Sequence, residues 1–338
     1  MRRISPLLLT LVLAAPFARA ADRYSAARAL KVGGEGGWDY VTVDPAHGLL
    51  FLPRTTHTLV VDAKTGKTVA DIPGQTRNHG VALAQAADRG FITDGGDGSV
   101  TVFSLKDYKV LGKIAAADDA DGAIFDPASN KVLVACGDAG KLVPIAADVD
   151  PKGGKAEPAI ELGGKPEFLA VDGGGRAFVA LTDKDEIAVI DTKAMKLIAK
   201  WPTAPGGRPV GLGIGADGKR LVVGCRKPQK LLIMSTEDGK IVADLPLGAG
   251  VDAAAFDGAD ALASCGDGTL TVARAGADGQ WSVAQTVQTR KGSRTMGVDA
   301  KTGAVYLPAA DFEAAGGKGR PKLKAGTFRV LVVERGAE

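Results

Sequence analysis

One sequence pattern recurs seven times along the 338-residue chain, at intervals of 40 to 46 residues. Each copy contains a short apolar run, a turn such as Asp-Pro or Asp-Gly, and further apolar runs that end in turn residues. A repeat of this length with several short strands is typical of the blades of a β-propeller. The innermost runs are residues 38–44, 78–84, 120–126, 166–172, 209–214, 251–257 and 294–299. The sequence therefore predicts an all-β, seven-bladed propeller.

Each repeat is predicted to form a blade of four strands. In the fourth repeat these are residues 168–171, 176–181, 186–191 and 196–201, bounded by Gly, Asp and Pro. The seventh repeat ends after its third strand. Because an open ring would expose two strand edges, we expect an N-terminal strand at residues 27–32 to complete the seventh blade.

The first twenty residues have the form of a secretory signal. Arg2 and Arg3 precede an apolar stretch at 7–17, and Ala18-Arg19-Ala20 has the small-x-small pattern of a cleavage site. Eleven apolar residues are too few to span a bilayer, which needs about 18 or more. We therefore expect a signal peptide at 1–20, one propeller domain at 21–338, no membrane span, and a periplasmic or secreted protein.

The charge balance argues against nucleic acid as a partner. Loss of the signal removes three arginines and leaves 39 basic residues against 39 acidic ones. A protein that neutralises phosphates would carry a basic excess, and one that stacks bases would carry more than 5% aromatic residues. We expect no nucleic-acid binding.

Several repeats resemble the YVTN-type β-propeller family, which includes YncE-like exported bacterial proteins. The resemblance covers residues 27–335 and depends on Phe-Val-Ala at 178–180, Ala-Val-Ile-Asp-Thr at 188–192 and Val-Val-Asp-Ala-Lys-Thr-Gly-Lys at 60–67. The second strands depart from the family, which usually ends them in Asn. Here those positions hold Arg54, Asp94, Cys136, Leu181, Cys225, Cys265 and Ala309. The resemblance implies a seven-bladed ring and export, but no reaction.

A ring of charged residues is the leading candidate for a binding site. In a propeller the first residue of each inner strand lies near one mouth of the central channel. The aligned positions are Asp39, His79, Asp121, Glu167, Val210, Asp252 and Arg294. Convergent charges on a rigid scaffold suit ligand binding. Trp38, which precedes Asp39, is expected to stack on the ligand, and Arg54 is placed in the same ligand-binding set.

Two other interpretations of the ring remain open. Asp39, His79, Asp121 and Glu167 together offer carboxylate oxygens and one imidazole, which suit a single Ca²⁺ or Mn²⁺ ion better than Zn²⁺. Alternatively, the acids hydrogen-bond to neighbouring backbone or meet solvent. We assign no cofactor and no metal ligand.

No catalytic residue is assigned either. His47, His57 and His79 lie in no triad motif, and no nucleophile elbow, phosphate loop or zinc-protease motif occurs. Cys136, Cys225 and Cys265 share one repeat position, so they lie too far apart for a disulfide and are expected to be buried thiols. A basic insertion at 311–327 is expected on the rim of the charged ring.

These observations favour an exported binding or interaction protein. The charged mouth is expected to bind a small molecule or a cell-envelope protein, and the protein is expected to be a monomer. The alternative is a metal-dependent propeller hydrolase or lactonase acting at the same mouth.

Overall fold

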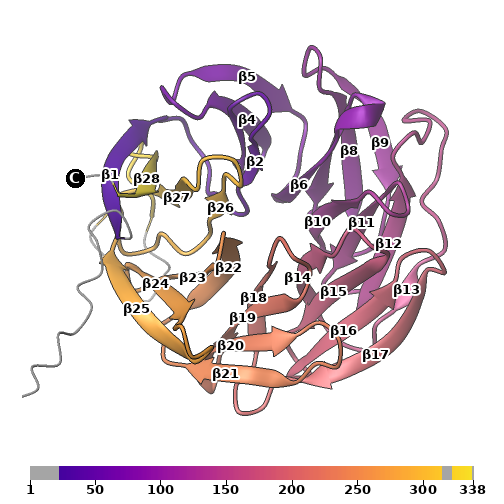
Figure 1. The fold of residues 1–338 in the computed structure, drawn as a ribbon. Helices are drawn as coiled ribbons and strands as arrows, with labels where there is room; N and C mark the ends of the chain where they lie inside the picture. The colour runs from indigo at the N-terminus through magenta and orange to yellow at the C-terminus, as the bar shows by residue number, and fades with distance from the viewer. Residues whose placement is uncertain (1–22, 314–321, 337–338) are drawn as a thin grey trace, which may run out of the picture.

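The computed structural model describes residues 23–313 and 322–336, and these form a seven-bladed β-propeller (Figure 1). Seven four-stranded antiparallel sheets surround a central channel. In six sheets the strands run in chain order from the inner to the outer edge. The predicted fold class is confirmed. The predicted signal at 1–20 lies outside the described residues.

The strand bounds follow the repeat. Blades one and two contain β2 (Thr42–Asp44), β3 (Leu49–Pro53), β4 (His57–Asp62), β5 (Thr68–Pro73), β6 (Asn78–Ala84), β7 (Arg89–Asp94), β8 (Ser99–Ser104) and β9 (Val110–Ala115). Blades three and four contain β10 (Ala120–Asp126), β11 (Lys131–Cys136), β12 (Lys141–Ala146), β13 (Ile160–Glu161), β14 (Pro166–Val171), β15 (Arg176–Leu181), β16 (Glu186–Asp191) and β17 (Lys196–Pro202). Blades five and six contain β18 (Pro209–Ile214), β19 (Arg220–Arg226), β20 (Gln229–Ser235), β21 (Ile241–Leu245), β22 (Val251–Asp257), β23 (Asp260–Cys265), β24 (Thr269–Ala275) and β25 (Trp281–Gln288). A 3₁₀ turn, η2 (Gln85–Ala87), follows β6.

The seventh blade joins the two ends of the chain. Its strand order is β26 (Gly297–Val298), β27 (Val305–Ala309), β28 (Arg329–Arg335) and β1 (Tyr24–Lys31). The first and last strands therefore lie side by side, indigo beside yellow in Figure 1. The predicted closure is confirmed, with a strand that begins three residues earlier than expected.

The core lies between adjacent sheets. Second and third strands are covered on both faces, so their sequences are nearly continuous apolar runs. All six residues of β23 are buried, and so are the four central residues of β16. Outer strands have one solvent face and alternate instead, as in β25. Two layers of apolar side chains thus hold each blade to its neighbours.

The three cysteines lie at or near the ends of β11, β19 and β23. Each thiol is free and fully buried. This placement agrees with the predicted role as small apolar side chains. Within residues 23–313 and 322–336, no helix is long and apolar enough to cross a membrane.

Candidate ligand site at the channel mouth

A cavity of about 300 Å³ occupies one mouth of the channel. The structure brings all six predicted charged ring residues to it. The lining residues are Asp39, Tyr40, Arg77, His79, Asp119, Asp121, Lys165, Glu167, Phe168, Arg226, Asp252 and Arg294. Residues from all seven blades therefore converge on one small space.

Irregularities in the inner strands present these side chains to the channel. Five inner strands carry a register shift near their first residue, where one extra residue enters the strand. The shifts fall between Asn78 and Val81, Ala120 and Ala123, Pro166 and Leu169, Pro209 and Gly211, and Val251 and Ala253. The extra residues include His79, Asp121, Glu167, Val210 and Asp252. In blades one and seven, Asp39 and Arg294 lie just before the short strands β2 and β26.

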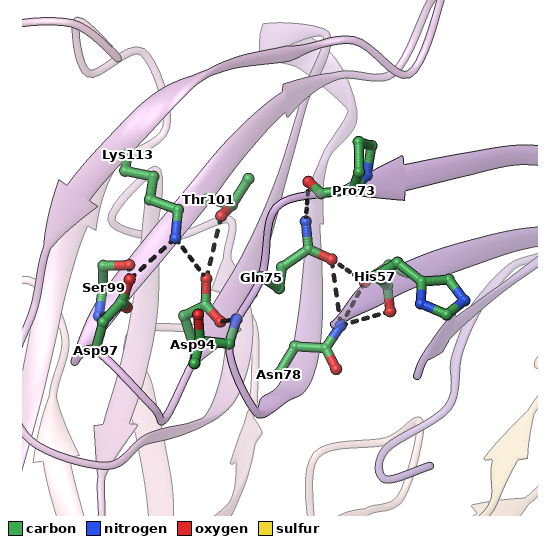
Figure 2. Close-up of polar contacts among 11 residues, drawn as sticks. His57, Pro73, Gln75, Asn78, Asp94, Asp97, Ser99, Thr101 and Lys113 are labelled. Atoms are coloured by element: carbon green, nitrogen blue, oxygen red, sulfur yellow. Dashed lines mark hydrogen bonds and ion pairs between the residues drawn. The ribbon is translucent and has the colours of Figure 1, made fainter. Parts of the chain in front are cut away.

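Buried polar contacts hold the segment that carries His79 (Figure 2). The side-chain amide of Asn78 donates to the carbonyl of His57 over 2.8 Å and to Oγ1 of Thr58 over 3.0 Å. Gln75 donates to the carbonyl of Pro73 over 2.7 Å. These bonds tie the start of β6 to the neighbouring blade, so His79 has a fixed position.

Asp94, at the end of β7, anchors the same segment. Its fully buried carboxylate accepts a hydrogen bond from the backbone amide of Thr76 and forms an ion pair with Lys113 at 3.0 Å (Figure 2). The anchored segment also contains Arg77, which adopts a left-handed backbone conformation with a φ of 56° and lines the cavity. The last residue of the second strand thus supports the loop rather than the mouth itself.

His79 lies between two carboxylates. Its Nδ1 is 2.6 Å from Oδ2 of Asp39 and 3.5 Å from Oδ1 of Asp121. Burial alone lowers the pKa of His79, but the hydrogen bond to Asp39 and the charge of Asp121 outweigh it and raise the pKa. Nε2 of His79 faces Gly95. A Cβ atom on residue 95 would lie 2.6 Å from this nitrogen, so only glycine leaves room for the imidazole.

Three further cations, Arg77, Lys165 and Arg226, join the ring with Asp119, and sequence reasoning did not find them. Arg77 pairs with Asp119, and Lys165 lies 3.8 Å from the same carboxylate. Arg226 pairs with Asp252, which Arg294 also approaches to 3.0 Å. Arg77, Asp119 and Lys165 each stand two residues before a ring residue, so their shared repeat position was the available signal.

The charges are layered by depth. Side-chain exposure is 8% for Asp252 and 14% for Asp119 and Asp121, but 55% for Arg77 and 52% for Arg294. The carboxylates therefore lie deep in the mouth, and the long basic side chains form its outer collar.

Glu167 differs from the other acids. Among the described residues no hydrogen bond or ion pair engages its half-buried carboxylate, although it lines the cavity. Burial raises the pKa of Glu167, and the charge of Asp252 raises it further, while Arg226 opposes them. The ionised carboxylate is thus destabilised where it stands.

Two aromatic rings form the floor of the mouth. Tyr40 and Phe168 lie with ring centroids 4.5 Å apart and border both the mouth and a second cavity of about 540 Å³ along the channel. The second cavity is lined mainly by apolar inner-strand residues. One from each blade is Val43, Leu83, Phe125, Val171, Ile214, Phe256 and Val298. The charged mouth therefore opens onto an apolar channel.

Trp38 and Arg54 were expected at the mouth, but neither lines this cavity. Trp38 packs on Phe328 and Phe312, with ring centroids 5.5 and 6.4 Å apart. Arg54 is 1% exposed and donates to the carbonyls of Gly33, Gly36 and Gly37, each over 2.9 Å. Its guanidinium carbon lies 3.7 Å from the Phe328 ring centroid.

These contacts give Arg54 a structural role. Three backbone carbonyls accept its hydrogen bonds, and burial lowers its pKa to about 10. The glycine-rich segment at 33–37 links the closing strand β1 to the first blade. Arg54 therefore fixes the path by which the chain enters the ring.

Three of the four residues considered as metal ligands lie close together. One carboxylate oxygen each of Asp39 and Asp121 and a ring nitrogen of His79 lie within 4.8 Å of one another. A metal-bound histidine ordinarily donates its other N–H to an acceptor. Nε2 of His79 is buried without such a partner among the described residues. The cluster offers suitable oxygen ligands but does not orient the imidazole for a metal.

Comparison with protein families finds no matching family model, and no curated protein matches the chain. Among solved structures, the chain is similar to hydrazine synthase of Kuenenia stuttgartiensis. The TM-score is 0.69 at 15% identity, and the match covers 82% of this chain and 92% of that one. Likeness at this identity shows the propeller fold alone.

Proposed function

We propose that the protein is an exported propeller of the YVTN type that binds a small charged ligand at the channel mouth. The main observation in favour of ligand binding is the convergence of five carboxylates, four cations and His79 on one cavity of about 300 Å³. The signal-like sequence at 1–20 and the repeat motifs support export. A protein of the cell envelope is the other class of partner that this rim suits.

The rigid ring supports binding more directly than catalysis. Each mouth side chain stands on a strand or an anchored loop, so the charges are arranged before a ligand arrives and little ordering cost remains. The ion pairs occupy most of these charges among themselves. A nucleophile paired with an oriented base has no counterpart among the residues of this cavity.

A thermal-shift screen of small charged metabolites tests this function. Wild type is compared with the mouth variants Glu167→Gln and Arg294→Gln and with Lys64→Gln, which changes the opposite end of blade one. The proposal expects a compound that raises the melting temperature of wild type and Lys64→Gln but has a smaller effect on the mouth variants. Equal shifts in all four proteins would exclude the mouth as the site.

A metal-dependent hydrolase or lactonase is the second candidate. The observation that favours it is the close grouping of Asp39, His79 and Asp121. A divalent ion there would polarise a carbonyl or activate water. The test is elemental analysis of protein purified without chelator. About one ion per chain, lost in Asp39→Asn/His79→Gln, would favour this candidate over simple binding.

A further inference from the structure

We infer that the mouth binds a small zwitterion of the amino-acid type, with its ammonium group deep against Glu167 and its carboxylate at the outer basic collar. This inference rests on the proposed function and names its ligand class. It follows from three features of the cavity.

The first feature is the unpartnered carboxylate. His79 pairs with Asp39 and Asp121, Arg77 pairs with Asp119, and Arg226 and Arg294 pair with Asp252. Lys165 pairs with Asp138 at 2.6 Å and lies 3.8 Å from Asp119. Among the described acids that line the cavity, Glu167 alone has no ion pair or hydrogen bond. This half-buried carboxylate lines the cavity without a donor of its own, so it marks the place where a ligand donor is expected.

The second feature is the surroundings of Tyr40. Four carboxylates line the same cavity as Tyr40: Asp121, Glu167, Asp39 and Asp252. Burial raises the pKa of Tyr40, and the charges of these acids raise it further. Negative potential therefore converges over the Tyr40–Phe168 pair. An ammonium group there would meet carboxylate oxygens and the face of an aromatic ring, both of which attract a cation.

The third feature is the basic collar. Arg77 and Arg294 are more than half exposed at the outer edge, above the deep acids. Arg294 shares its partner Asp252 with Arg226, and Arg77 pairs with Asp119. An anionic group entering last would meet the exposed guanidinium groups of Arg77 and Arg294. A simple cation would leave the collar unused, so a zwitterion fits the layering better.

Isothermal titration with three matched probes tests the inference: 4-aminobutyrate, n-butylammonium and butyrate, at constant ionic strength. We expect 4-aminobutyrate to bind most tightly, n-butylammonium more weakly, and butyrate not measurably. Glu167→Gln should weaken both amines at least about tenfold, the effect of losing a charge-assisted hydrogen bond. Arg294→Gln should weaken 4-aminobutyrate several-fold and leave n-butylammonium within about twofold.

Phe168→Leu is an independent test of the aromatic contribution, because it leaves every charged residue of the mouth in place. It should weaken both amines, because the aromatic face is lost. Butyrate binding as tightly as 4-aminobutyrate, or an unchanged affinity in Glu167→Gln, would overturn the inference. If all three probes fail while another charged compound binds in a mouth-dependent way, the ligand class is wrong and the proposed function stands. If no binding of any compound depends on the mouth, both fail.

Discussion

The hydroxyl of Tyr24, in the first strand, lies 2.6 Å from Oδ2 of Asp257 in the sixth blade. The same hydroxyl is 3.0 Å from Oδ2 of Asp260 and accepts a hydrogen bond from Arg335 in the last strand. Residues from the first strand, the last strand and a neighbouring blade thus meet at one polar cluster. The ring is closed by side chains as well as by the β1–β28 ladder.

Tyr24→Phe should lower the free energy of unfolding by about 1–3 kcal/mol, because Asp257 and Asp260 lose the one hydroxyl donor that they share. Chemical denaturation measures this loss. Tyr306→Phe is the matched control, since no hydrogen bond engages the buried Tyr306 hydroxyl among the described residues, and it should change stability by less than about 0.5 kcal/mol. Equal effects of the two substitutions would contradict a role in closure.

Arg54→Met should destabilise the protein by about 2–4 kcal/mol. It removes three hydrogen bonds to carbonyls at 33–37 and leaves those acceptors without partners. Arg28→Met, on the exposed face of β1, is the control and should change stability little. A stable Arg54→Met protein that has lost ligand binding would instead restore Arg54 to the binding site.

Stability should depend on pH through His79. Its pKa in the folded protein lies above the unfolded value of about 6.5, because Asp39 and Asp121 outweigh the effect of burial. The stabilisation is therefore fully present below about pH 6.5 and is lost as pH rises through the folded pKa. The difference in unfolding free energy between wild type and His79→Gln should be largest near pH 5–6 and shrink above pH 7. A difference that grows with pH would refute this assignment.

Glu167 and Asp252 should respond oppositely to neutralisation. Glu167→Gln removes an unpartnered, half-buried charge and should stabilise the ligand-free protein by about 1 kcal/mol at neutral pH. Asp252→Asn deprives Arg226 and Arg294 of their shared partner and should destabilise by about 1–3 kcal/mol. Melting temperatures measured side by side test the pair. Destabilisation by Glu167→Gln would show that this carboxylate has a partner in the folded protein.

The thiols should be inert in the native state. Burial raises the pKa of Cys136, Cys225 and Cys265 to about 12, so almost no thiolate forms at neutral pH. A colorimetric thiol reagent should label none of them in native protein and three per chain in denaturant. Rapid labelling without denaturant would mean that a second strand opens locally.

The blades could be predicted from the sequence because each middle strand is buried on both faces and therefore consists of a run of apolar residues. The bounds of β15 and β16 match the expectation at every residue, whereas β13, the outer strand of the third blade, has only two residues. The ring residues were also found, since one repeat position faces the channel in every blade. Arg226 was missed because it stands at the end of a second strand and reaches the cavity only through its long side chain.

Trp38 and Arg54 show what sequence position leaves undetermined. Both lie near mouth residues in the chain, yet their side chains turn toward Phe328 in the last blade. That contact joins residues almost 300 positions apart, and no local pattern encodes it. Likewise the depth order of acids and cations depends on side-chain length and on bulge geometry rather than on residue type alone.

The extra residue at the start of five inner strands can contact a ligand without taking part in the strand pairing that builds the blade. A bulged residue has no partner of its own in the neighbouring strand, so exchanging its side chain leaves the sheet pairing intact. Each of these five blades therefore supplies one position whose side chain can change without altering the strand pairing. A new ligand preference would need a few codon changes at the mouth, while the ring that carries them stays the same.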